Sequence, residues 1–114
     1  MNYFDKEEYY GNKEYKLFIN IKKKERILSQ FFFRMREGHG NAHYFIGVTD
    51  NGSLYITNFK YLLYSINKFI NIVQKHTKFK LRIFIKKPYV FSIIYLHNPT
   101  ILHNYDIIDF NNFN

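Results

Sequence analysis

The sequence predicts an α+β fold, because strand-like and helix-like hydrophobic patterns succeed one another along a short chain. Apolar and polar residues alternate over residues 14–21 and 79–86, as in half-buried strands. Apolar residues recur at helical spacing over residues 25–37 and 58–77. Asp50-Asn51-Gly52 is a strong tight-turn signal between two further strand-like runs. Together the patterns give the order β-α-β-β-α-β of a ferredoxin-like sandwich, here with an added C-terminal strand.

The first strand and the first helix are expected within residues 14–37. Alternation over residues 14–21 places on one face Tyr15, Leu17, Ile19 and Ile21. Over residues 25–37 the apolar stripe of the helix consists of Ile27, Leu28, Phe31, Phe32 and Met35. Gly38 stands where a left-handed C-cap glycine is expected, so the helix should end there.

A hairpin and the second helix are expected within residues 42–77. The runs 42–48 and 53–57 flank the turn and are rich in aromatic and β-branched residues, so they should pair as antiparallel strands. Thr57 or Asn58 can cap a helix that ends near Thr77. The stripe of this helix consists of Phe59, Leu62, Leu63, Ile66, Phe69, Ile70 and Val73. We expect Leu62, Leu63, Ile66, Phe69 and Val73 to be buried against the sheet.

Residues 79–86 predict a strand with two different faces. The apolar face consists of Phe79, Leu81, Ile83 and Ile85. The opposite, mostly cationic face consists of Lys80, Arg82, Phe84 and Lys86. An apolar run over residues 90–96 predicts the added strand. Since both helices are expected on one side of the sheet, the other face should remain available to a partner.

Length and composition favour a single domain. The chain has 114 residues and a mass of 14.0 kDa. We expect the domain over residues 14–97, between an N-terminal arm of residues 1–13 and a C-terminal tail of residues 98–114. The absence of cysteine excludes a disulfide framework and a thiolate metal site. Because no secretory signal and no long apolar window are found, we expect a cytoplasmic protein without a membrane partner.

The charge of the chain is positive and unevenly distributed. The formal net charge is +8, and no acidic residue occurs between Asp50 and Asp106. A basic surface of this kind can neutralise the phosphates of a nucleic acid. The candidate RNA contacts are Lys22, Lys23, Lys24, Arg34, Arg36, His39, Lys75, Lys78, Lys80, Arg82, Lys86 and Lys87. The alternative is a solvated basic face that only keeps an aromatic-rich protein in solution.

Base stacking is a weaker hypothesis than phosphate contact at the level of sequence. Most aromatic residues occupy positions that the apolar periods assign to the core. The rings that fall on expected outer faces are Phe18, Phe84, Tyr61 and Tyr64. No RNA-recognition signature of the Lys/Arg-Gly-Phe/Tyr type occurs in the chain.

Neither catalysis nor a metal or cofactor is expected. No Gly-x-Ser-x-Gly elbow occurs, and no paired carboxylates share an expected face. The histidines are His39, His43, His76, His97 and His103, and they lack the cysteine or carboxylate partners of common metal sites. The Gly38-His39-Gly40-Asn41 loop could wrap a phosphate, but a helix stop is the favoured interpretation, because phosphate loops precede helices.

One stretch of the chain resembles a known family. Residues 34–52 read Arg-Met-Arg-Glu-Gly-His-Gly-Asn-Ala-His-Tyr-Phe-Ile-Gly-Val-Thr-Asp-Asn-Gly. This stretch resembles the domain that precedes the GTPase in GTP-binding protein 1 and GTP-binding protein 2. There a helix ends in Arg-x-x-Glu-Gly-x-Gly-Glu-Ala-x-Tyr, followed by Ile-Gly-Val, an acidic residue and an Asp-Asn-Gly turn. The resemblance extends over roughly residues 11–96. Asn41 replaces the family's glutamate, and residues 53–56 lack its usual glycine.

The resemblance implies a role in translation. The family consists of elongation-factor-like translational GTPases that work near the ribosome or in RNA quality control. The chain contains no Gly-x-x-x-x-Gly-Lys-Ser/Thr loop and stops where the GTPase would begin, so nucleotide hydrolysis is not expected. The resemblance therefore implies that the chain corresponds to the accessory domain alone.

We therefore expect a non-enzymatic, ribosome-associated RNA-binding module that contacts rRNA and ribosomal proteins. It would act by occupancy, either blocking or marking idle ribosomes, as a ribosome-hibernation factor does. DNA is not an expected partner. The alternative is an adaptor that docks a separately encoded translational GTPase or RNA-decay factor through the open sheet face or a strand edge.

Overall fold

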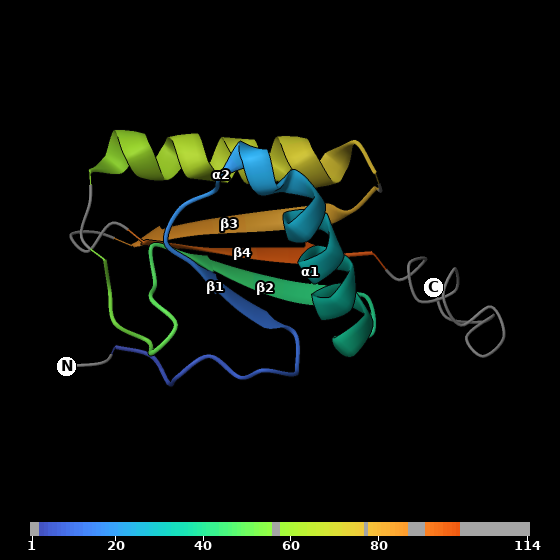
Figure 1. Cartoon of the computed structure of the whole chain (residues 1–114), viewed down its shortest axis with the longest axis horizontal. Helices are drawn as coiled ribbons and strands as arrows, with labels where there is room; N and C mark the ends of the chain where they lie inside the picture. Colours follow the sequence, from blue (N-terminus) through green and yellow to red (C-terminus); the bar gives the residue numbers. More distant parts are fainter. Residues whose placement is uncertain (1–2, 56–57, 77, 87–90, 99–114) are drawn as a thin grey trace, which may run out of the picture.

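The computed structural model describes residues 3–55, 58–76, 78–86 and 91–98 of the chain (Figure 1). Its elements are β1 (Lys13–Lys16), the 3₁₀ helix η1 (Ile21–Lys23), α1 (Lys24–Glu37), β2 (Asn41–Ile46), α2 (Phe59–Gln74), β3 (Lys80–Lys86) and β4 (Phe91–His97). The expected cap Thr57, the expected helix end at Thr77, the candidate contact Lys87 and all of the tail after Asn98 lie outside the described residues.

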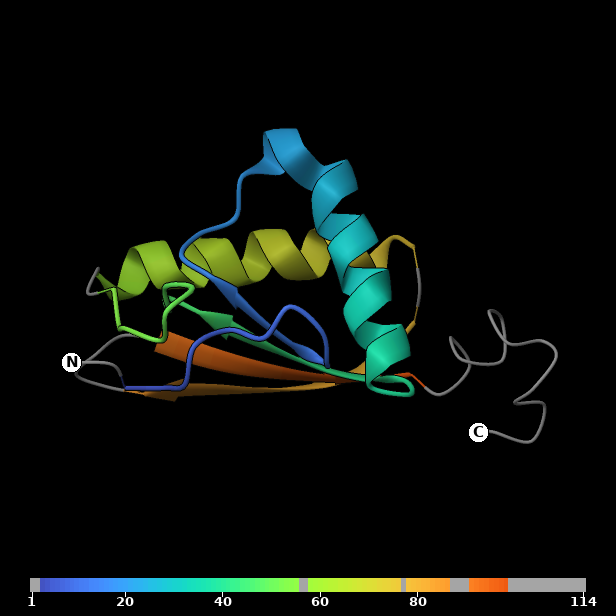
Figure 2. The same ribbon diagram turned by 60° about the horizontal axis from the view of Figure 1, so that its bottom comes forward.

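Both helices lie on one side of a four-stranded mixed sheet (Figure 2). The strands lie in the order β1-β2-β4-β3, with β1 parallel to β2 and the other neighbours antiparallel. The predicted α+β class is confirmed, and the strand order fits a ferredoxin-like arrangement with an added C-terminal strand. The described elements follow one another as β-α-β-α-β-β, without the second strand of the predicted hairpin. The position of the C-terminal strand could not be read from the pattern: β4 lies between β2 and β3.

The first strand is shorter than the alternation predicts. β1 pairs with β2 from Lys13 to Lys16, and β2 ends at Ile46, the partner of Lys16. Beyond that point the chain has no strand to pair with, so residues 17–20 leave the sheet. Ile19 is buried by the helices instead, while Ile21 is exposed and begins η1.

The predicted hairpin is reduced to one isolated bridge between Val48 and Leu54. The N-terminal arm binds the backbone of the turn beside this bridge. The amides of Tyr3 and Phe4 donate hydrogen bonds to the carbonyl of Gly52 at 3.0 and 2.9 Å. A Cβ at Gly52 would lie 2.0 Å from the carbonyl oxygen of Phe4. The turn glycine therefore makes room for the arm as well as for the turn.

The end of α1 differs from the expected left-handed cap at Gly38. Gly38 has a φ of −97°, and the left-handed positions are His39 and Gly40, with φ of 54° and 94°. The amide of Gly40 donates to the carbonyl of Met35 at 2.7 Å and closes the helix. Gly38 is needed for another reason: a Cβ there would lie 1.8 Å from the carbonyl oxygen of Asn41.

The second helix begins as predicted, with the Asn58 side chain accepting a hydrogen bond from the amide of Tyr61 at 2.8 Å. Four members of the expected stripe are buried, namely Leu62, Ile66, Phe69 and Val73. Leu63 is 36% exposed and Phe59 is also exposed, so their predicted placement in the core is wrong. Leu63 lies about 100° around the helix from Leu62, which turns it away from the sheet.

The buried residues form two layers, one on each face of the sheet. The larger layer lies under the helices and contains Phe31, Phe69 and Tyr44. The smaller layer lies on the opposite face, where Tyr15, Phe45, Val48 and Phe91 pack under Phe4 of the arm. The arm therefore covers one end of the face that the sequence leaves uncovered.

Replacing Ile66 by alanine should lower the free energy of unfolding by about 2 to 5 kcal/mol, because Ile66 is 2% exposed and its removal leaves a cavity. The matched change Leu63→Ala should cost about 0.5 kcal/mol or less, as at other surface positions. Denaturant unfolding of both variants measures the difference. Equal losses would contradict the assignment of the two faces of α2.

Candidate nucleic-acid interface

The pairing register assigns the residues of β3 and β4 to the two faces of the sheet. Leu81 and Ile83 stand opposite Leu96 and Ile94, which belong to the core under the helices. Arg82 stands opposite Tyr95 on the other face. The predicted alternation of β3 into an apolar and a mostly cationic face is confirmed. Ile83 and Ile85 are nevertheless exposed, because β3 is an edge strand.

Three rings lie side by side across neighbouring strands on this second face. The ring centroids of His43 and Tyr95 are 4.5 Å apart, and those of Tyr95 and Phe84 are 5.2 Å apart. The guanidinium carbon of Arg82 lies 5.8 Å from the centroid of Phe84. Phe84 is 47% and Tyr95 36% exposed, so both rings present a surface to solvent. We call His43, Arg82, Phe84 and Tyr95 the open-face patch.

The N-terminal arm limits the open-face patch to one end of the sheet. The ring of Phe4 packs on Phe45 at 5.1 Å and on Phe91 at 5.3 Å between centroids. Tyr3 lies 5.7 Å from Phe91. The rings under the arm are thus withdrawn from solvent, whereas the rings of the open-face patch are presented to it.

The charge around the open-face patch is positive. Lys80 and Lys86 lie on the same face of β3 as Arg82 and are exposed. Burial, and then the positive charge of Lys13, lower the pKa of His43, so its imidazole is neutral at pH 7. The patch therefore combines uncharged rings with flanking cations.

The sequence does not single out Tyr95 and His43 as site residues. The alternation of residues along β4 could have predicted the placement of Tyr95, because assigning Ile94 and Leu96 to the core places Tyr95 on the opposite face. The pairing of Tyr95 with His43 could not be predicted from the sequence, since it depends on the register between two strands far apart in the chain.

The eleven predicted RNA contacts that lie within the described residues do not form one surface. Lys80, Arg82 and Lys86 lie at the open-face patch. Lys22, Lys23 and Lys24 are exposed at η1 and the start of α1, and Lys75 lies at the end of α2, on the helical side. Arg36 and His39 lie at the far end of α1, and Lys78 lies between α2 and β3. The chain thus carries several separate basic regions.

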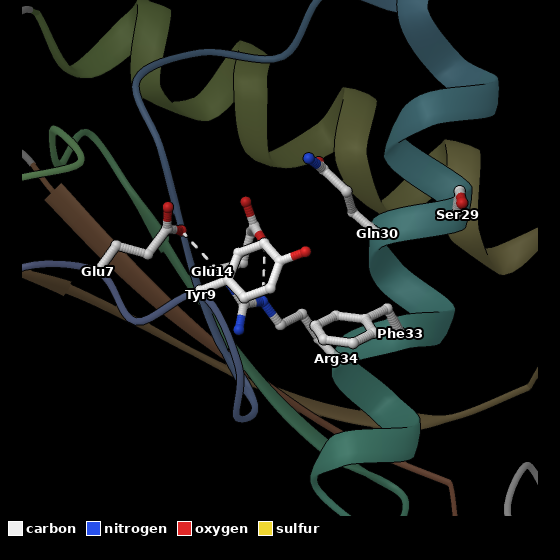
Figure 3. Close-up of a pocket in the computed structure, with 7 residues that line it drawn as sticks. All are labelled: Glu7, Tyr9, Glu14, Ser29, Gln30, Phe33 and Arg34. Carbon is white, nitrogen blue, oxygen red and sulfur yellow. Dashed lines mark hydrogen bonds and ion pairs between the residues drawn. The ribbon is translucent and has the colours of Figure 1, made fainter.

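The prediction that Arg34 contacts RNA is wrong, because this residue is 4% exposed and cannot reach RNA at the surface. Its Nε donates to Glu14 at 2.8 Å, and its terminal nitrogens donate to the carbonyls of Gly11 and Glu8 at 2.8 and 3.0 Å. A carboxylate oxygen of Glu7 lies 3.8 Å from the same group (Figure 3). The guanidinium group therefore holds the arm and β1 onto α1.

The same contacts bring together two carboxylates from different segments, Glu7 of the arm and Glu14 of β1. Glu7 and Glu14 both approach Arg34, beside a surface pocket of about 410 Å³ that Tyr9, Gln30 and Phe33 also line. Burial is the main cause that raises the pKa of Glu7 to about 7, and Glu14 and Asp50 add to it. Both carboxylates contact Arg34, which holds the arm and β1 onto α1. We therefore assign this pocket a structural role in fixing the arm.

No group of three or more His, Asp or Glu side chains within the described ranges is arranged to hold a metal ion. The described part of the chain also contains no helix long and apolar enough to cross a membrane.

The stability of the fold should fall as the pH rises through about 7, because Glu7 binds its proton more tightly in the folded chain than in the unfolded one. The stabilisation that comes from the Glu7 proton is fully present below the ordinary glutamate pKa of about 4.3, and it is lost as the pH rises through about 7. In Glu7→Gln this part of the pH dependence should disappear, while the neighbouring exposed Glu8→Gln should retain it. Urea unfolding as a function of pH measures both. Identical profiles for Glu7→Gln and the wild type would contradict the assignment.

Comparison of the chain with known proteins gives no match to a family model, a curated protein or a solved structure. The open-face patch is therefore interpreted from its own geometry.

Proposed function

We propose that the chain is a non-enzymatic RNA-binding module that contacts single-stranded RNA through the open-face patch. The observation that carries this proposal is the row of rings formed by His43, Tyr95 and Phe84, flanked by cations of β3. Exposed rings on a sheet serve as platforms for unstacked bases, and each stacked base contributes about 1–3 kcal/mol.

The geometry favours single strands over duplexes. A sheet face offers no helix or ribbon to enter the major groove of DNA, and A-form RNA hides its bases in a deep, narrow groove. Bases that are free of pairing can stack on the exposed parts of Tyr95 and Phe84, whose rings are inclined to each other by 60°, while Lys80, Arg82 and Lys86 contact the phosphates on the same side of β3. The RNA is thus held by stacking in the middle of the face and by charge at its edge.

The ribosome is the proposed location of that RNA. The support is the resemblance of residues 34–52 to the domain before the GTPase of GTP-binding protein 1 and GTP-binding protein 2. These 114 residues contain no phosphate-binding loop that could time release. The module would therefore act by occupancy, remaining on an idle ribosome and blocking or marking a site until another factor displaces it.

A second candidate is an adaptor for a protein partner, and the exposed edge of β3 favours it. Ile83 and Ile85 are exposed on this edge strand, whose outer backbone groups have no neighbouring strand in the described sheet. An extended peptide could add to such an edge. Capture of the partner would then survive ribonuclease, whereas the RNA-binding proposal requires that ribonuclease abolish ribosome binding.

Replacing the rings should weaken RNA binding without unfolding the protein. Tyr95→Leu and Phe84→Leu should each lower the affinity for an oligouridine of about 10 nucleotides by about 5-fold or more, because each removes one stacking surface. Phe18→Leu is the matched control, since Phe18 is an exposed ring outside the patch. Fluorescence anisotropy measures the affinities, and cosedimentation with ribosomes tests the location. Unchanged affinity in both patch variants would overturn the stacking role.

The salt dependence of binding should report the phosphate contacts. Changing Lys80, Arg82 and Lys86 together to glutamine should reduce the slope of log affinity against log salt by about 0.7 for each phosphate that is no longer neutralised. Binding titrations at several salt concentrations measure that slope, and circular dichroism checks the fold. An unaltered slope would mean that these cations form only a solvated face.

A further inference from the structure

A second basic region lies on the helical side of the sheet, away from the open-face patch. A pocket of about 300 Å³ lies between the beginning of α1 and the last turns of α2. The polar groups that line it belong to Lys24, Lys68, Asn71, Lys75 and His76. Its volume falls at the small end of ligand pockets, which span roughly 300–1,000 Å³. We call it the helical pocket.

The spacing of α2 directs these side chains to one place. Lys68, Asn71 and Lys75 are separated by three and four residues, so they share one face of the helix across two turns. Ile72 lies on the same side and is buried, which gives the pocket an apolar wall. Lys24, the first residue of α1, lines the pocket from the other helix.

The positive charge of the helical pocket is not balanced by the described residues. None of its lining residues is acidic, and α2 contains no acidic residue. The ion pairs within the described ranges involve Lys16 and Arg34, not the lysines of the pocket. Nζ of Lys68 lies over the ring of Tyr64, 5.2 Å from its centroid, and this ring does not itself line the pocket. Like charges around one hollow repel one another, and a bound anion would relieve that repulsion.

We propose that the helical pocket binds a phosphate group, either of a free phosphate compound or of the 5′ end of an RNA. Three ammonium groups can donate charge-assisted hydrogen bonds to the phosphate oxygens, and the Asn71 amide and His76 imidazole add further donors. The apolar wall at Ile72 excludes water from one side and strengthens these contacts. This site is separate from the open-face patch, because the helices and the patch lie on opposite faces of the sheet.

The first experiment uses pyrophosphate as the probe, with isothermal titration calorimetry on the full chain. Pyrophosphate should bind the wild type, and the combined change of Lys24, Lys68 and Lys75 to glutamine should weaken binding by about 10-fold or more. Lys60→Gln is the control for charge, because Lys60 is exposed in the first turn of α2 outside the pocket. No binding to the wild type, or equal losses in the triple variant and the control, would overturn the proposal.

A second experiment distinguishes the two sources of the phosphate. Two oligouridines of the same sequence, one with a 5′-phosphate and one with a 5′-hydroxyl, are compared for affinity. A preference for the 5′-phosphate that Lys75→Gln removes identifies the RNA end as the ligand. Pyrophosphate binding without such a preference identifies a free phosphate compound. Tyr95→Leu should leave pyrophosphate binding unchanged, so failure of the stacking proposal and failure of this one are told apart.

Discussion

The buried guanidinium group of Arg34 determines how the N-terminal part of the chain is arranged. It joins α1 to β1 through Glu14, and it joins α1 to the arm through two backbone carbonyls. An arginine stays charged in a protein, so its burial requires all of these acceptors at once. The arm is thereby held where Phe4 covers the rings of Phe45 and Phe91. The division of the second sheet face into a covered and an open part follows from this ion pair.

The residues on which the proposed resemblance rests have structural roles in the same region. The carboxylate of Glu37 accepts a hydrogen bond from the amide of Gly11 at 2.9 Å, one turn after Arg34. Gly38 leaves room for Asn12, and Gly52 leaves room for Phe4. The Arg-x-x-Glu-Gly pattern and the Asp-Asn-Gly turn thus serve to seat the arm. These packing roles do not depend on what the module binds.

The spacing of apolar and polar residues along short segments predicted the helices and strand faces of this chain. The helices, the Asn58 cap and the two faces of β3 follow from periods of a few residues. The failures concern pairing between distant segments. Apolar and polar residues do alternate after Lys16, but the described sheet contains no strand that pairs with this part of the chain. The contacts of Glu7 and Glu14 with Arg34, and the row of His43, Tyr95 and Phe84, depend on which segments meet across the fold. Single-sequence periodicity contains no such information, so the cations of β3 could be predicted and the ring surface beside them could not.

The placement of β4 between β2 and β3 has a consequence for the nascent chain. β2 and β3 do not pair with each other, so the sheet is incomplete until β4 enters it. That step joins residues as far apart as Asn41 and His97, which are separated by 56 positions. Closing a long loop costs entropy and slows folding. The rings of the patch come from β2, β4 and β3, so a chain that still lacks β4 has no assembled ring surface. If the patch binds bases as proposed, this affinity would arise only after synthesis has passed His97, and the growing chain would not bind RNA through this face before then.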